Sequence, residues 1–121
     1  MFRITGLERV EMYSDPDNFC AEVSLANLGN GELVAVFAQN RGLQHTDTGS
    51  ILLIRSTDNG QTWDPASKVV VMEEEEDAGW NIAAICCLSD GTLLVHANRW
   101  RYLTDGRIDW MTGKSEIDGV W

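Results

Sequence analysis

The sequence predicts an all-β fold. Short apolar runs bounded by turn-forming residues dominate the chain, and no long stretch shows the 3.6-residue period of an amphipathic helix. A second observation is an internal repeat. The stretch Leu28-Gly29-Asn30-Gly31-Glu32-Leu33-Val34 aligns without a gap on Leu88-Ser89-Asp90-Gly91-Thr92-Leu93-Leu94, from residue 28 to residue 88, a shift of 60 residues. We therefore expect a set of antiparallel strands that occurs twice.

The first set of strands is expected in the first part of the chain. Its four strands are predicted at residues 20–28, 33–39, 50–56 and 67–72. Their connections are a glycine-rich turn at Gly29–Gly31, a longer loop at 40–49 and a turn at Ser56–Trp63.

The second set is expected over residues 80–121, because the same shift places Arg41 on Arg101 and Leu25 on Ile85. This set is incomplete. Its third strand would lie around residues 108–116, and residues 115–121 repeat the serine, aspartate, glycine and tryptophan of the earlier turn with a different spacing. A period of tens of residues made of four short strands is typical of a β-propeller blade. We interpret residues 20–72 as blade one, residues 80–121 as blade two, and residues 1–19 as an N-terminal segment.

The turn Ser56-Thr57-Asp58-Asn59-Gly60-Gln61-Thr62-Trp63 carries the most specific pattern. Asp58 is short enough to accept backbone N–H groups of its own turn, Gly60 supplies a positive φ, and Trp63 follows as an apolar anchor. The pattern S-x-D-x-G-x-T-W, which Ser56, Asp58, Gly60, Thr62 and Trp63 satisfy, resembles the Asp-box of sialidases and other Asp-box β-propellers. The resemblance implies a six-bladed propeller of the sialidase type, with this structural turn on the face away from the active site.

The inner strands of a propeller are covered on both faces by neighbouring blades and should be apolar nearly throughout. Residues 33–38 and 82–88 fit that description. Two blades cannot close a ring, and open blade faces would leave apolar patches and unpaired strand edges in water. The remaining blades are expected from a longer chain or from homo-oligomerisation, in which three two-bladed chains would complete a six-bladed ring. The segment Phe2–Tyr13 could be a strand that completes a blade elsewhere.

Composition excludes some partners. The 121 residues carry 9 basic and 19 acidic side chains, and this net charge of −10 repels nucleic acid phosphates and anionic membranes. No apolar run approaches the ~20 residues of a membrane span, and the N-terminus lacks a signal-peptide core. The three cysteines are an odd number, and Cys86 and Cys87 would point to opposite faces of a strand. We expect reduced, buried thiols and a cytoplasmic protein.

Because antiparallel strands alternate in direction, the connections sort into two ends. The tight turns at 29–31, 56–63 and 89–91 lie at one end, and the longer loops at 14–19, 40–49, 73–81 and 100–107 lie at the other. Binding and catalytic residues are commonly found on long loops held by a rigid scaffold. The second end is therefore the predicted functional face, with Trp80, Asn81 and Arg101 among its substrate-binding residues.

The resemblance extends to particular residues of this face. Phe37-Ala38-Gln39-Asn40-Arg41, a following loop with Asp47, and then Ile51–Ser56 are similar to the first blade of sialidases. This similarity implies that Arg41 is a cation of the substrate pocket and that Asp47 is the general acid/base. The alternative is that Asp47 forms an Asx-type turn within its loop.

One departure from the family concerns the substrate. Where sialidases carry an Arg-Ile-Pro motif whose arginine binds the carboxylate of the sugar, this chain has Ala21-Glu22-Val23. The Glu22 carboxylate would repel an anionic sugar. It could instead accept hydrogen bonds from the hydroxyl groups of a neutral sugar, or it could pair with Arg41.

No metal or cofactor is expected. His45 and His96 stand in different predicted blades without a ligand pattern around them. The run Glu73–Asp77 could bind calcium, but a solvated loop extended by its like charges is the preferred interpretation. Trp80 and Trp100 could stack on sugar rings or pack between blades.

Two classes of function follow. The first is a sialidase-like glycoside hydrolase that acts on a glycan at the loop face, with Asp47 as acid/base and Arg41 in the pocket. The second is a non-catalytic Asp-box propeller that binds carbohydrate or protein on the same face.

Overall fold

The computed structural model describes residues 6, 8–102, 108–109 and 114–115, and these residues form strands and connections without a helix. The all-β prediction is confirmed. The strands are β1 (Asn18–Gly29), β2 (Glu32–Arg41), β3 (Ser50–Ser56), β4 (Asp64–Met72), β5 (Ala78–Cys87), β6 (Leu93–Arg101), β7 (Ile108–Asp109) and β8 (Lys114–Ser115).

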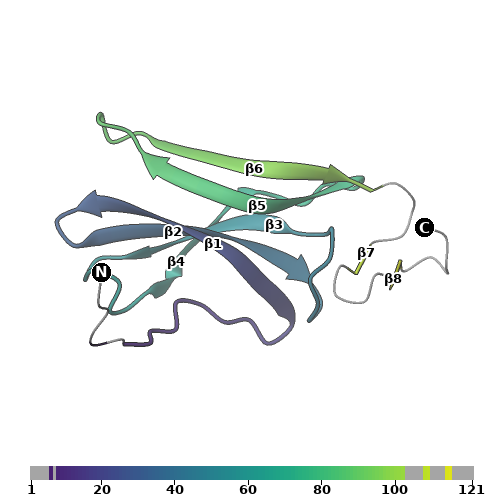
Figure 1. The fold of residues 1–121 in the computed structure, drawn as a ribbon, viewed down its shortest axis with the longest axis horizontal. Coiled ribbons are helices and arrows are strands. Elements are labelled where there is room, and N and C mark those ends of the chain that lie inside the picture. The colour runs from purple at the N-terminus through teal and green to yellow at the C-terminus, as the bar shows by residue number, and fades with distance from the viewer. Residues whose placement is uncertain (1–5, 7, 103–107, 110–113, 116–121) are drawn as a thin grey trace, which may run out of the picture.

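The first four strands form one antiparallel sheet in the order β1-β2-β3-β4 (Figure 1). All four predicted strands of the first set are present, and each begins or ends within three residues of its predicted boundary. Hairpins between sequential neighbours produce this meander, because each connection is short enough to return the chain beside the strand it leaves.

The second set differs from its prediction. β5 and β6 form one two-stranded antiparallel sheet, and β7 and β8 form another. The predicted third strand near 108–116 is therefore replaced, among the described residues, by a separate short hairpin. The repeated turn expected at 115–121 falls almost entirely outside the described residues. The sheets that the described residues form do not close into a ring.

The internal repeat reappears in the backbone. In the first hairpin Asn18 lies opposite Arg41, and in the second, 60 residues later, Ala78 lies opposite Arg101. The irregularity in β1 falls between residues 21 and 24, and the one in β5 falls between residues 81 and 84. The β1–β2 and β5–β6 hairpins thus share one register, including the position of a β-bulge, which bends a strand locally.

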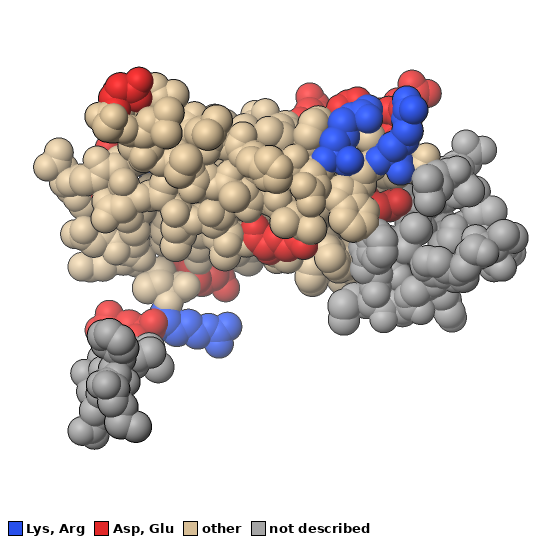
Figure 2. Space-filling model, turned by 45° about the horizontal axis from the view of Figure 1, so that its top comes forward, with Lys and Arg blue, Asp and Glu red and all other residues tan. Residues whose placement is uncertain are grey.

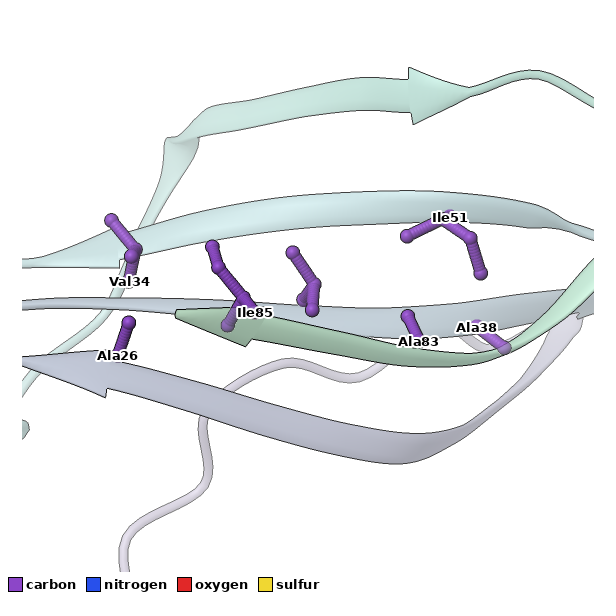
Figure 3. Close-up of a cluster of buried hydrophobic side chains, with 7 residues drawn as sticks. Ala26, Val34, Ala38, Ile51, Ala83 and Ile85 are labelled. Atoms are coloured by element: carbon purple, nitrogen blue, oxygen red, sulfur yellow. The ribbon is translucent and has the colours of Figure 1, made fainter. Parts of the chain in front are cut away.

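The β5–β6 hairpin packs across one face of the four-stranded sheet, and the main core lies between them (Figure 3). Ala83 and Ile85 of β5 are the hairpin's buried contribution to this core. They pack against every second side chain of the facing strands, on the side of the sheet that β5 covers. These side chains are Ala26, Val34, Val36, Ala38 and Ile51. Burial of such apolar area is worth about 25 cal/mol per Å² and holds the two sheets together.

The opposite face of the four-stranded sheet is covered by other means. Its buried residues are Ala35, Phe37, Leu52 and Ile54. Met12 and Tyr13 of the N-terminal segment and Trp63 after β3 pack on them, and the Tyr13 and Phe37 rings lie 5.1 Å apart. Residues 8–13 thus form an irregular cover, and the strand predicted at Phe2–Tyr13 is not present in this described part.

The prediction that both inner strands are covered on both faces holds for only one of them. β2 is buried almost throughout, because β5 covers one of its faces and the Met12–Tyr13 segment covers the other. β5 alternates between buried and exposed residues, since only its sheet-facing side is covered in the described structure. The apolar run at 82–88 therefore places Ile82 and Leu88 in solvent.

The Ser56–Trp63 turn is held by its own side chains, as predicted. The Asp58 carboxylate accepts hydrogen bonds from the Thr62 N–H at 2.9 Å, the Thr62 hydroxyl at 2.6 Å and the Ser56 hydroxyl at 2.8 Å. Gly60 has a φ of 81° and donates its N–H to Ser56 Oγ. These contacts, with the Thr62 hydroxyl first, lower the pKa of Asp58 to about 2.

This pKa predicts how the stability of the fold depends on pH. Because the folded-state pKa lies below the ordinary 3.8, the Asp58 carboxylate stabilises the fold fully above about pH 4, and its contribution is lost as the pH falls toward 2. The difference in unfolding free energy between wild type and Asp58→Asn should shrink over that interval in denaturant titrations. Thr62→Val should move the carboxyl pKa of Asp58, measured by NMR, back toward 3.8; an ordinary pKa in the wild type would contradict the hydrogen bonding.

Candidate functional site

The connections lie at two ends, as the alternation of strand direction predicts. At one end the Asn59 N–H donates to the carbonyl of Gly31, which joins two of the tight turns. At the other end the Trp80 N–H donates to the carbonyl of Gly49, and Arg41 contacts Glu74. The longer loops at 42–49 and 73–77 therefore meet the ends of β1, β5 and β6 at this second end.

A pocket of about 180 Å³ lies near this end. Its lining combines a carboxylate, an imidazole, a carboxamide, an aliphatic side chain and an indole, which are those of Glu22, His45, Asn81, Ile82 and Trp100. Glu22 and Asn81 are predicted substrate-binding residues, and the structure brings them together here. The remaining predicted site residues, Asp47, Arg41, Trp80 and Arg101, do not line it.

The two β-bulges create the pocket. Glu22 and Ile82 both have positive φ, at 59° and 52°, and they occupy the bulge positions of β1 and β5. A β-branched residue such as isoleucine rarely adopts this conformation. The Ile82 N–H donates to Glu22 Oε2 at 2.7 Å, so one bulge is bonded directly to the other.

His45 completes the polar side of the pocket. Its Nε2 lies 3.5 Å from Glu22 Oε1, and its ring packs 5.7 Å from the ring of Phe19, measured between centroids. Glu22 therefore pairs with His45 and the Ile82 backbone, and the suggested pairing of Glu22 with Arg41 is wrong. Sequence reasoning overlooked Ile82, although the 60-residue shift places this residue on Glu22.

Asn81 connects the pocket to the 42–49 loop. Its Oδ1 accepts a hydrogen bond from Asn40 Nδ2 at 2.9 Å, and Asn40 also donates to the carbonyl of Thr48. Asn81 Nδ2 in turn donates to the carbonyls of Asp47 and Thr48 at 3.5 and 3.4 Å. Both asparagines are buried, so these hydrogen bonds fix the loop and offset part of the desolvation cost of the two amides. Among the described residues, Asn40 Oδ1 is a buried acceptor without a hydrogen-bond partner.

Asp47 itself is only 4% exposed. In this conformation its side chain is covered by protein. Its role as acid/base, and the alternative of an Asx-type turn, stay predictions.

The predicted pocket cation Arg41 is engaged outside the pocket. Its guanidinium lies 2.6 Å from Glu74 Oε1, and the same carboxylate oxygen accepts a hydrogen bond from the Tyr102 hydroxyl at 2.5 Å. The Glu74 carboxylate raises the pKa of Arg41. Burial, with Glu74 as the second cause, raises the pKa of Tyr102. Arg41 thus ties the end of β2 to the 73–77 loop.

The acidic run at 73–77 is solvated as expected, since Glu73 and residues 75–77 are exposed, but ion pairs with arginines hold three of its five carboxylates, those of Glu74, Glu75 and Asp77. Arg99 contacts Glu75 at 2.5 Å and Asp77 at 3.0 Å, and Arg101 contacts Asp77 at 2.9 Å. These arginines lower the pKa of both carboxyl groups. Figure 2 shows basic side chains gathered beside acidic ones at one end of this face. Arg101, predicted to bind substrate, therefore binds the loop.

Trp80 and Trp100 were predicted to lie in loops, but both lie in strands. Trp80, in β5, packs against the main core, whereas Trp100, in β6, lines the pocket. His96 is exposed on β6.

The three cysteines are unpaired, but Cys86 is exposed and the other two are half-buried, so the prediction of buried thiols is wrong. Within the described residues, no group of three or more His, Cys, Asp and Glu side chains is placed to hold a metal ion. That part of the chain also contains no helix with the length and hydropathy of a membrane span.

No protein-family model matches the chain, and no curated protein or solved structure shows significant similarity to it.

Gly79 provides a test of how the loop is held. A Cβ at this position would clash with the carbonyl oxygen of Asp47 and lie 2.8 Å from the carbonyl carbon of Thr48. Gly79→Ala should therefore destabilise the fold by roughly 3 kcal/mol, the upper range for overpacking. Gly91→Ala, with open space but a φ of 85°, should cost only about 1 kcal/mol. Equal losses in chemical denaturation would show that the loop does not press on β5.

Proposed function

We propose that the chain is part of a β-propeller of the sialidase type and that its pocket binds an uncharged sugar unit of a glycan. The pocket lined by Glu22, His45, Asn81, Ile82 and Trp100 carries this proposal. Sugars present hydroxyl groups around their edge and C–H groups on their faces. Carboxylate and carboxamide groups can hydrogen-bond to the hydroxyls, and an indole offers an apolar surface to the ring.

The propeller part of the proposal is supported by the repeat. The β1–β2 and β5–β6 hairpins share the same register and the same bulge position, and they pack face to face. Successive blades of a propeller are arranged in this way. The self-satisfied turn at Ser56–Trp63, at the end away from the pocket, agrees with the Asp-box pattern.

The charges near the pocket favour a neutral ligand. Its lining contains the Glu22 carboxylate and neither lysine nor arginine, while Arg41 and Arg101 are paired with Glu74 and Asp77. A carboxylate sugar would thus meet a negative group without a compensating fork of N–H donors. At about 180 Å³ the pocket is smaller than the roughly 300–1,000 Å³ typical of drug-sized ligands, so one sugar ring is the size it suits. A cytoplasmic location is also part of the proposal, and the unpaired cysteines are compatible with it.

Binding can be followed through the indole N–H signals in NMR spectra. Titration with neutral monosaccharides should shift the signal of Trp100 and leave that of Trp63, at the opposite end, unchanged. Glu22→Gln should weaken binding about tenfold or more, since hydrogen bonds to a charged group are worth roughly 1.5–3 kcal/mol. Glu32→Gln, whose carboxylate pairs with Arg55, is the matched control. A preference for carboxylated sugars, or shifts at Trp63 alone, would refute the proposal.

Glycoside hydrolysis is the second candidate function. The observation that favours it is the position of the Asp47 loop, which borders the pocket through His45 and through the bonds from Asn81. Because Asp47 is buried, proton transfer to a glycosidic oxygen would require this loop to open.

Hydrolysis of a panel of aryl glycosides tests this second candidate. If Asp47 is the acid/base, Asp47→Asn should lower turnover by roughly 10²–10⁴-fold while binding in the NMR titration persists. Equal rates in Asp47→Asn and wild type would remove Asp47 from the mechanism. Binding without turnover in the wild type would leave the non-catalytic function.

A further inference from the structure

The internal repeat shows that one face of the β5–β6 hairpin is exposed where the equivalent face of the β1–β2 hairpin is covered. The residues of the first hairpin that contact β5 include Ser24, Ala26, Val34 and Val36. Their counterparts 60 residues later are Ala84, Cys86, Leu94 and His96, and all four are exposed. The same side of the same hairpin is thus a core in the first copy of the repeat and a surface in the second.

The complementary surface is on β1. Ala83 and Ile85, the residues that β5 buries against the sheet, correspond to Val23 and Leu25 of β1. Val23 and Leu25 are each 55% exposed. On β1 the chain therefore exposes the counterparts of the two residues with which β5 makes the internal contact, beside a β2 face that Met12 and Tyr13 cover.

We name Ile82, Ala84, Cys86, Leu94 and His96, which are exposed on one side of the second hairpin, the outer strip, and Val23 with Leu25 the β1 strip. Leu94 is 57% exposed, and Ile82, which also lines the pocket, is 46% exposed. Neither strip contains a carboxylate, a lysine or an arginine. Figure 2, which brings the β5–β6 side of the molecule forward, shows a continuous uncharged area on this face. Apolar surface of this kind marks interaction sites on soluble proteins.

The two strips are better suited to each other than to a polar partner. At the internal contact, Glu22 and Ser24 hold β5 through the backbone N–H groups of Ile82 and Ile85. In the second hairpin these two anchoring positions are occupied by Ile82 and Ala84, so the outer strip offers apolar contact in their place. Two chains that each carry a net charge of −10 repel, and an uncharged contact avoids adding to that repulsion.

We propose that a second copy of this chain docks head to tail, with its β1 strip on the outer strip of the first. The contact repeats between chains the packing of β5 on β1 and β2 within the chain. Because the two surfaces differ, the interface is heterologous, and each bound copy presents a fresh outer strip. Association then continues until a ring closes or extends as a filament.

Three leucine-to-glutamate variants test this arrangement. Leu94→Glu disrupts the outer strip, and Leu25→Glu disrupts the β1 strip. Leu43→Glu is the matched control, because Leu43 is 69% exposed in the 42–49 loop and outside both strips. Since all three leucines are exposed, the variants should fold, which NMR spectra or circular dichroism can verify.

Molar mass is measured by light scattering over a range of concentrations. Wild type and Leu43→Glu should exceed the 13.5 kDa of the monomer increasingly with concentration, whereas Leu25→Glu and Leu94→Glu should each remain monomeric. A mixture of Leu25→Glu and Leu94→Glu retains one intact pair of surfaces. It should therefore form dimers of one copy of each and nothing larger.

Three results would overturn the proposal. A wild type that stays monomeric at every concentration would show that a second copy does not cover the face. Full assembly by Leu25→Glu would indicate a symmetric contact between two outer strips. Equal disruption by Leu43→Glu would place the contact in the loop.

Discussion

The packing of β5 across β1, β2 and β3 is the interaction on which the rest of the structure depends. Ala83 and Ile85 fill the face formed by Ala26, Val34 and Val36, and this contact joins two sheets that share no hydrogen-bonded strand pair. It also sets the position of Ile82 over Glu22 and of Asn81 against the 42–49 loop. Without it, the residues that line the pocket would belong to separate units.

At the pocket, the tertiary structure holds two residues in backbone conformations that their own side chains disfavour. Positive φ values at Glu22 and Ile82 cost on the order of 1–3 kcal/mol each. The hydrogen bond from the Ile82 N–H to Glu22 offsets part of that cost and keeps the carboxylate facing His45. Proteins commonly break local rules at functional sites, because the geometry needed there is not the one that the isolated chain prefers.

The ion pairs at the same end of the sheet hold the 73–77 loop in place. Arg41, Arg99 and Arg101 all reach the acidic 73–77 loop, where they offset three of its five negative charges. They are partly exposed, so each pair contributes little stability by itself. Together these ion pairs fix the loop that precedes β5. They also engage Arg41 and Arg101 outside the pocket, so these arginines do not offer the pocket the positive charge that an anionic ligand would require.

The sequence by itself determined the four strands of the first sheet, the 60-residue repeat and the bonding of the Ser56–Trp63 turn. These features rest on contacts between residues close in the chain, such as the hydrogen bonds between Ser56, Asp58 and Thr62, or on a pattern that one alignment reveals. Only the tertiary structure decided which apolar strand faces are covered, so the burial of β5 and of Cys86 was predicted wrongly. It likewise decided that Glu22 meets His45 and that Arg41 meets Glu74, because charged side chains choose among several partners and only the packing of β5 sets their distances.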